Sequence, residues 1–122
     1  MVKYTSHSHQ SLTERLMAFR DARDWRQFQS LKNLIVSLNL EAAEMLELTQ
    51  WKMDEEVENS MENREFIDKL THEMADIFIY LLMISERTGV DLMKAASDKI
   101  EHNATKYPIN KSRGNARKYT DL

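Results

Sequence analysis

The sequence predicts an all-α fold, and two observations carry that prediction. The chain of 122 residues holds only two glycines and one proline, too few for the tight turns of a sandwich, a barrel or a doubly wound sheet. Its apolar residues recur instead at helical spacing, as Leu12, Leu16 and Phe19 do along the first predicted helix. Because the length is that of one domain, we expect a single helical domain over residues 1–122.

The first two predicted helices cover residues 11–23 and 31–51. The first begins with a capping box, in which the side chains of Ser11 and Glu14 each accept a hydrogen bond from the other's backbone N–H. Ser30 is the N-cap of the second. The first half of this second helix is apolar on almost every side, which indicates burial by its own bundle or by a second subunit.

The later part of the chain carries two more predicted helices. An acidic stretch over residues 52–65 is expected to be a solvated linker. The third helix covers residues 64–88 and stops at Gly89, the residue type that most often ends a helix in the left-handed conformation. The fourth covers residues 91–106, with an aspartate as its N-cap, and it ends there because Pro108 disfavours helix at the residue before it. The four long helices together predict a four-helix bundle.

The composition excludes several kinds of protein. The chain has no cysteine, so disulfides, thiolate metal sites and cysteine nucleophiles are excluded. Two glycines cannot form a glycine-rich phosphate loop. No apolar run approaches the length of a membrane span, and the polar stretch 1–10, expected to be disordered, does not read as a signal peptide. We therefore expect a cytoplasmic protein with no membrane partner.

The net charge of −3 is unevenly distributed along the chain. It argues against general binding of nucleic acid, which favours a basic protein. Residues 109–122, expected to be an irregular tail, carry a net charge of +3, whereas the rest of the chain carries −6. A basic tail on an acidic body indicates a place where the tail meets an anion or another subunit.

Two acid pairs at helical spacing carry the main chemical signal. Glu41 and Glu44 lie three residues apart on the second predicted helix, and Glu73 and Asp76 lie three apart on the third. They interrupt apolar faces, where a lone carboxylate is costly or becomes protonated. A divalent cation would relieve this cost and the repulsion between the acids, and ligation by carboxylates alone favours Mg²⁺ or Mn²⁺. The alternatives are a solvated helix face, or pairing of a core acid with a buried lysine or arginine.

Other candidate residues accompany these acids. Lys99 and Asn103 lie four residues apart on the apolar stripe of the fourth helix. In one interpretation Lys99 is the ion-pair partner of a core acid and Asn103 is a core amide. In the other, both residues contact a phosphate. Tyr80 lies one helical turn beyond Asp76, as a core residue or as a hydroxyl donor to a ligand. Three large aromatics lie near the ends of the second helix: Trp25, Phe28 and Trp51. They either pack against the core at the helix ends or stack against the base of a nucleotide.

The acid pairs form an ExxE…ExxD pattern, which further segments accompany: Arg23–Phe28, Gln50–Trp51, Lys99-x-x-x-Asn103-x-x-x-Tyr107-Pro108 and the ending Arg117–Leu122. Together they resemble the MazG-type all-α nucleoside triphosphate pyrophosphohydrolases, and within them the dCTP pyrophosphatase branch. The resemblance covers residues 12–122. It implies a dimer or tetramer in which water cleaves the α–β phosphoanhydride of a dNTP, giving dNMP and pyrophosphate.

The resemblance also implies roles for the candidate residues. The two acid pairs bind Mg²⁺, the metal holds the triphosphate, and Glu41 or Glu44 takes the proton of the attacking water. Lys99 and Asn103 contact phosphates or sugar. The base and sugar pocket is formed by Trp25, Phe28, Trp51 and Tyr80. One position departs from the branch, because Leu16 stands where a histidine is expected, so dATP and modified dCTP join dCTP as expected substrates.

Two other functions remain open at this point. The bundle hydrolyses another nucleotide, such as dUTP or phosphoribosyl-ATP, or it is a non-enzymatic helical interaction module whose acids bind a structural metal. A panel of nucleotide substrates distinguishes the first alternative from a dCTP pyrophosphatase. The second alternative predicts that no pyrophosphate is released from any nucleotide.

Overall fold

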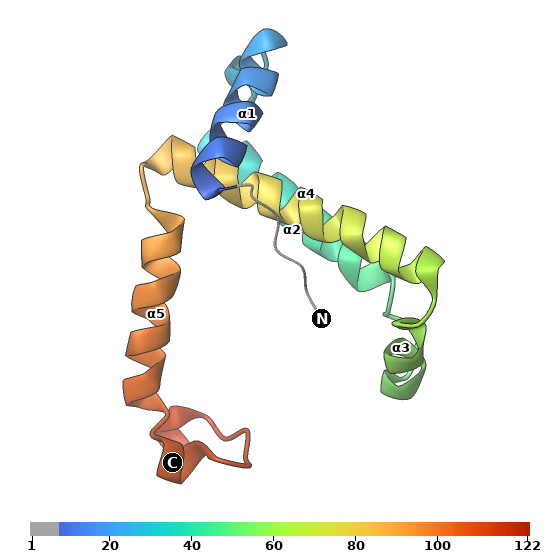
Figure 1. Ribbon diagram of the computed structural model, residues 1–122, viewed down its shortest axis with the longest axis vertical. Coiled ribbons are helices and arrows are strands. Elements are labelled where there is room, and N and C mark those ends of the chain that lie inside the picture. Colours follow the sequence, from blue (N-terminus) through green and yellow to red (C-terminus); the bar gives the residue numbers. More distant parts are fainter. Residues whose placement is uncertain (1–7) are drawn as a thin grey trace. The chain divides into compact units, whose positions relative to one another are not determined.

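The computed structural model describes residues 8–122, and every regular element among them is helical (Figure 1). The elements are α1 (His9–Ala22), η1 (Arg26–Phe28), α2 (Leu31–Glu47), α3 (Asp54–Ser60), α4 (Arg64–Thr88), α5 (Leu92–Lys106), α6 (Ile109–Ser112) and η2 (Tyr119–Asp121), where η marks a 3₁₀ turn. The predicted all-α class is therefore confirmed. The chain forms two compact units, one ending at Gly89 and the other beginning at Val90.

The first unit is built on two long helices, α2 and α4, which lie side by side (Figure 1). The helix α1 contacts α4 as well. The buried apolar side chains of this packing are Leu34 of α2 and, from α4, Phe66, Leu82 and Met83. The pair of α2 and α4 is thus the frame that positions the candidate acids.

A buried arginine joins α1 to α4. Arg20 is 5% exposed, and its guanidinium donates from Nε to Asp21 at 2.8 Å and from Nη1 to Glu86 at 3.2 Å. A buried charge without partners is strongly unfavourable, so these carboxylates allow the arginine to stay inside. The contact with Glu86 fixes α1 against the last turns of α4.

Three helix ends follow the predicted signals. At the start of α2 the Ser30 hydroxyl accepts from the Asn33 backbone N–H at 3.1 Å, and at the start of α5 the Asp91 carboxylate accepts from the Lys94 N–H at 3.0 Å. Gly89 ends α4 with a φ of 74°, in the left-handed region. The predicted caps of α2 and α5 and the predicted bounds of α4 are confirmed.

The first helix begins earlier than predicted. Its N-cap is Ser8 and not Ser11, because the Ser8 hydroxyl accepts from the Ser11 backbone N–H at 3.0 Å. Ser11 lies inside the first turn, and its own hydroxyl donates to the Ser8 carbonyl at 3.1 Å. Of the stretch 1–10 that was expected to be disordered, residues 8–10 belong to the helix and its cap, and residues 1–7 lie outside the described part of the chain.

The helix α1 ends in a tight reversal before Trp25. The backbone N–H groups of Asp24 and Trp25 donate to the carbonyls of Asp21 and Arg20, both at 3.1 Å, which is the pattern of a Schellman motif. Asp24 has a φ of 52° and occupies the left-handed position that glycine usually takes. Its carboxylate and carbonyl accept from the Gln27 side chain at 2.9 and 3.1 Å, which links the reversal to η1.

Two predictions for the middle of the chain are wrong. The helix α2 ends at Glu47 and not at Trp51, because the Leu48 N–H turns to the carbonyl three residues back, on Met45, and a series of turns follows. The acidic stretch 52–65 is not a plain linker, since it contains α3. Three acids fall in the first turn of α3, where negative charge interacts favourably with the helix dipole.

The second unit consists of α5 and the segment that follows it. The tail over residues 109–122, predicted to be irregular, contains the short helix α6 and the turn η2. The Tyr119 ring stands edge-on to Tyr107 with 6.1 Å between centroids, and Lys106 Nζ lies 4.6 Å from the Tyr119 centroid. These contacts fold the tail back onto the end of α5.

Apolar side chains remain exposed on α2 and α4. Leu40 and Leu46 of α2 are each 60% exposed, and Met74 of α4 is 57% exposed. Exposed apolar surface of this extent favours contact with other protein. Within residues 8–122, no helix is long and apolar enough to cross a membrane.

Candidate functional site

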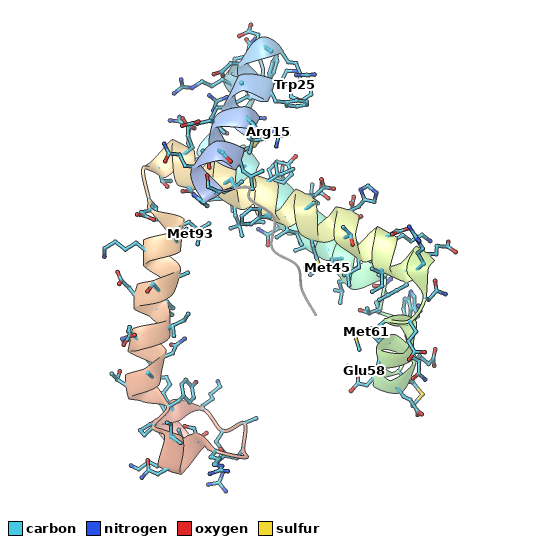
Figure 2. The ribbon with its side chains drawn as sticks, in the orientation of Figure 1. Arg15, Trp25, Met45, Glu58, Met61 and Met93 are labelled. Atoms are coloured by element: carbon cyan, nitrogen blue, oxygen red, sulfur yellow. The ribbon has the colours of Figure 1, made fainter. Side chains whose placement is uncertain are left out.

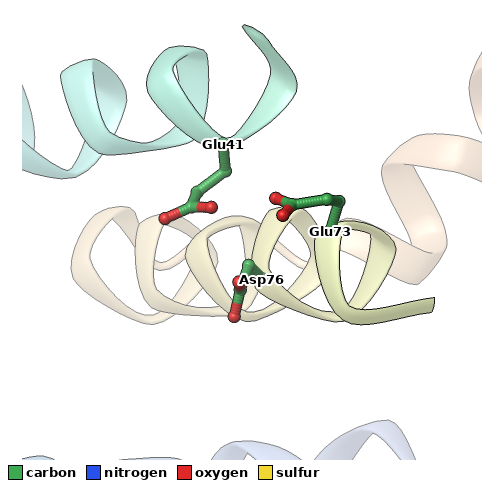
Figure 3. Close-up of side chains that lie close together, drawn as sticks. All are labelled: Glu41, Glu73 and Asp76. Carbon is green, nitrogen blue, oxygen red and sulfur yellow. The ribbon is translucent and has the colours of Figure 1, made fainter. Parts of the chain in front are cut away.

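Three acids from α2 and α4 converge in the first unit. One carboxylate oxygen from each of Glu41, Glu73 and Asp76 lies within 4.8 Å of the others. Figure 3 shows Glu41 reaching from α2 toward α4, with the Glu73 carboxylate turned toward it and Asp76 further along α4. Residues three apart share one face of a helix, so the packing of α2 on α4 brings these acids together.

Glu44 of α2 borders the same cluster. The pKa of Glu41 is raised to about 7, mainly by burial and then by interaction with Glu44 and by the charges of Asp76 and Glu73. Burial also raises the pKa of Glu73, followed by the charge of Glu44. Glu44 and Asp76 are therefore close enough to Glu41 and Glu73 to oppose the ionisation of those two carboxyls.

Two oxygens of the cluster have no hydrogen-bond partner. Glu41 Oε2 and Glu73 Oε2 are buried, and no described residue donates to either. Buried acceptors without a donor are rare and unfavourable in native proteins. A hard divalent cation would supply the missing partner to both oxygens and offset the repulsion between the acids. The donor set therefore fits Mg²⁺ or Mn²⁺.

Trp25 is held by two neighbours from the end of α1. Its ring stands edge-on to Phe19 with 5.7 Å between centroids, and the Arg23 guanidinium lies 3.6 Å from the Phe19 centroid and 5.9 Å from that of Trp25. Trp25 is 44% exposed, so ring surface remains available for a ligand. The sequence prediction omitted Phe19 and Arg23 as supports of Trp25. Phe19 and Arg23 lie four residues apart, which places an aromatic ring and a cation on one face of the helix. This spacing is the sequence signal that predicts their contact.

The other predicted aromatics are more exposed. Phe28 is 66% exposed in η1, and Trp51 is 89% exposed in the turn between α2 and α3. In Figure 2, Trp25 lies at the far end of α1, whereas Met61 and Glu58 lie beyond the opposite end of the α2–α4 pair. The 17 residues of α2 span about 25 Å, so this unit does not bring Trp51 to the two aromatics at the other end.

The remaining candidates divide between the two units. Tyr80 is half-buried on α4, one helical turn beyond Asp76. Lys99 and Asn103 lie on α5, where both are exposed. None of the ion pairs formed by residues 8–122 includes Lys99. The binding of phosphate by Lys99 and Asn103 stays a prediction.

Known proteins resemble this chain over most of its length. A family model described as the MazG-like family matches residues 36–122. The dCTP pyrophosphatase 1 of Bos taurus is 42% identical over 104 residues, which are 85% of this chain and 62% of that protein, and the dCTP pyrophosphatase 1 of Homo sapiens is 38% identical with 85% and 61% covered. The chain thus spans about six-tenths of the length of these curated relatives.

A solved structure gives an independent comparison. The crystal structure of a pyrophosphatase from Archaeoglobus fulgidus matches with a TM-score of 0.77 and 34% sequence identity, covering 88% of this chain and 99% of that one. The family match begins within α2, ahead of Glu41, and includes every residue of the acid cluster. The all-helical fold, the acid cluster and these matches agree, and the chain belongs to the MazG-like family.

Proposed function

We propose that this protein is a Mg²⁺-dependent nucleoside triphosphate pyrophosphohydrolase. It cleaves the α–β phosphoanhydride of dNTPs to dNMP and pyrophosphate, with dCTP or modified dCTP favoured and dATP as a further substrate. The observation that carries the proposal is the cluster of Glu41, Glu73 and Asp76, with Glu44 at its border. Membership of the MazG-like family and relatives named dCTP pyrophosphatase 1 and pyrophosphatase support the same reaction.

The four acids hold the metal ion in this proposal. Glu41 Oε2 and Glu73 Oε2, which lack donors, are the oxygens that most need a cation. When bound, Mg²⁺ offsets the charge of the phosphates and orients them for attack by water. The chain contributes rigidity, because Glu41 and Glu73 come from two packed helices and are already assembled before a ligand arrives. Mn²⁺ suits the same oxygens.

The acid pair on α2 takes the proton of the attacking water. The neighbouring Glu44 raises the pKa of Glu41, so a proton accepted by Glu41 is stabilised by the carboxylate beside it. The sequence has no cysteine, and the site residues include no serine or threonine that would act as a nucleophile. Direct attack by water, without a covalent intermediate, is the simplest course of the reaction.

The nucleotide is bound by the remaining candidates. Trp25, Phe28, Trp51 and Tyr80 surround the base and sugar, and Lys99 and Asn103 contact the phosphates. Because about 25 Å of α2 separates Trp51 from Trp25, a pocket that uses both rings needs a second copy of the chain. The protein therefore works as a homodimer or a dimer of dimers, which the exposed Leu40 and Leu46 also favour.

Release of pyrophosphate tests the proposed function. The protein is incubated with each of the four canonical dNTPs, 5-methyl-dCTP, dUTP and phosphoribosyl-ATP, with Mg²⁺ or with EDTA. We expect dNMP and pyrophosphate from dCTP in the presence of Mg²⁺, and neither product with EDTA. Metal-dependent thermal stability without product from any nucleotide would overturn the proposal and favour a structural metal site. If only dUTP or only phosphoribosyl-ATP were cleaved, the proposed type of reaction would hold and the proposed substrate would be wrong.

A further inference from the structure

The second unit carries positive charge that its own acids do not neutralise. Beyond Pro108 the tail has four cations and one acid, and all four cations are exposed: Lys111, Arg113, Arg117 and Lys118. The ion pair formed within this unit joins Lys94 to Asp98 on α5, away from the tail. Among residues 8–122, none of the four tail cations takes part in an ion pair. The tail therefore offers free positive charge to an anion.

The tail is folded, so these cations are presented on a formed surface. Gly114 adopts a φ of 77°, which lets the chain reverse after α6. Around this reversal the Asn115 side chain donates to the Lys111 carbonyl at 3.0 Å and accepts from the Arg117 backbone N–H at 3.1 Å. The reversal leads the chain back to α5, where Tyr119 contacts Tyr107. Ordering that is present before binding lowers the entropic cost of binding.

The point of attachment connects the tail to the candidate phosphate ligands. Lys99 and Asn103 lie four residues apart along one side of α5, and the C-cap residue Tyr107 follows after four more, so the three residues form a row of about 12 Å. Tyr119 contacts Tyr107 at the end of that row, and Arg117 and Lys118 directly precede it. The exposed Lys99 thus lies at one end of this row, and the exposed Arg117 and Lys118 are attached to its other end through the contact of Tyr119 with Tyr107.

We propose that Arg117 and Lys118 extend the row of Lys99 and Asn103 into one face that binds a chain of phosphates, with Tyr119 as the positioning residue that holds them there. This inference rests on the proposed function, and it adds the tail to the substrate-binding machinery. A row with cations at both ends suits a polyphosphate better than a single phosphate, since each phosphate group then finds its own positive charge. Arginine in particular binds phosphate oxygens through two parallel N–H groups.

The test compares the wild type with R117Q/K118Q in binding inorganic tripolyphosphate with Mg²⁺, measured by calorimetry, and in KM for dCTP. We expect binding of tripolyphosphate to weaken by about tenfold or more and KM to rise to match. K94Q, which removes a cation of the same unit that is already paired, serves as the matched control and should change neither value. Y119A should lower affinity as R117Q/K118Q does, and Y119F, which keeps the ring, should restore it.

The outcomes separate this inference from the proposed function. A wild type that hydrolyses dCTP, together with an R117Q/K118Q variant of unchanged tripolyphosphate affinity and KM, would overturn the role of the tail and leave the enzyme standing. A wild type that hydrolyses no nucleotide would overturn the proposed function. The tripolyphosphate titration would then still show whether Arg117 and Lys118 bind phosphates. Tail-dependent binding of single-stranded DNA with no binding of tripolyphosphate, or a loss of oligomer in R117Q/K118Q with normal affinity, would also overturn the inference.

Discussion

Glu41 and Glu73 are carboxylates whose surroundings oppose their charge. Burial is the largest cause for each, and the neighbouring acids add to it. Each also keeps one buried oxygen without a donor. A folded chain that holds such groups in place is less stable than it would be without them, which is common at functional sites. Substitutions at these positions therefore separate stability from activity.

The variant Glu73→Gln keeps the shape of the side chain and removes its charge. We expect hydrolysis of dCTP to fall about 100-fold or more, because one of the metal ligands is lost. We expect the melting temperature of the metal-free protein to rise, because the repulsion with Glu44 is relieved. Enzyme assays and thermal melts in EDTA measure the two effects. Glu47→Gln, at an exposed position of α2, is the control and should change neither value. Near-normal turnover of Glu73→Gln would show that Glu73 is not a metal ligand.

The raised pKa of Glu41 predicts how stability depends on pH. Its folded pKa of about 7 exceeds the ordinary value of 4.5, so between these values the folded chain binds more protons than the unfolded chain. The contribution of Glu41 to stability is therefore fully present below about pH 4.5 and is lost as the pH rises through 7. Thermal melts of the metal-free protein should show this decline between those pH values. The decline should flatten in Glu41→Gln, and an equal slope in both proteins would contradict the assignment.

At the scale of helices, the packing of α1 on α4 includes an ion pair between Arg20 and Glu86. Arg20 is almost fully buried, and Glu86, its partner on α4, keeps 31% of its side chain exposed. The reversal at the end of this same helix carries Trp25, so the attachment of α1 also places the predicted base-binding ring. A weaker attachment should therefore affect both folding and substrate binding.

The variant Arg20→Met removes the charge of this side chain and its hydrogen bonds to Asp21 and Glu86. We expect a loss of about 2–3 kcal/mol in the free energy of unfolding, below the value for fully buried pairs because Glu86 is in part solvated. Denaturant titration measures it. The double variant Arg20→Met with Glu86→Leu should recover part of the loss, since the half-buried Glu86 carboxylate is then no longer left without its partner, and Asp21 remains exposed to water. Equal stability of the single and double variants would show that the pair contributes packing only.

The aromatics at the two ends of α2 are predicted to stack against the base. Trp51→Ala and Trp25→Ala should each weaken binding of dCTP by about 1–3 kcal/mol. Affinity for Mn²⁺ should remain unchanged, because neither ring lies among the acids. Titration of both ligands into each variant measures this, with Trp51→Tyr as the variant that keeps a ring. Normal dCTP affinity of Trp51→Ala would make Trp51 a surface residue without a role in substrate binding.

The helices that the sequence predicted best are those with strong end signals. Asp91 and Gly89 fixed two ends because each satisfies a specific backbone need. The helix α3 escaped prediction because a seven-residue helix with one large apolar residue, Val57, shows no periodic pattern. For the site, spacing alone put Glu73 and Asp76 on one face, but their distance from Glu41 depends on how α2 packs on α4, which no local pattern encodes.

At the scale of the whole molecule, exposed apolar surface is the property that calls for a partner. Leu40, Leu46 and Met74 are each more than half exposed on the two helices that carry the acids. We expect the protein to sediment as a dimer or tetramer at micromolar concentration, because association would cover such residues. Analytical ultracentrifugation decides this. A stable monomer with full dCTP hydrolysis would show that no subunit boundary is needed for the pocket.

The left-handed backbone of Asp24 bears on how this protein would evolve. Glycine at this position avoids the contact between Cβ and the carbonyl oxygen that costs other residues about 1 kcal/mol. A selection for heat resistance would therefore find a change here early. The same change removes the carboxylate that Gln27 binds, and with it one support of the turn that bears Trp25. At position 24, a gain in backbone stability is thus set against the placement of Trp25.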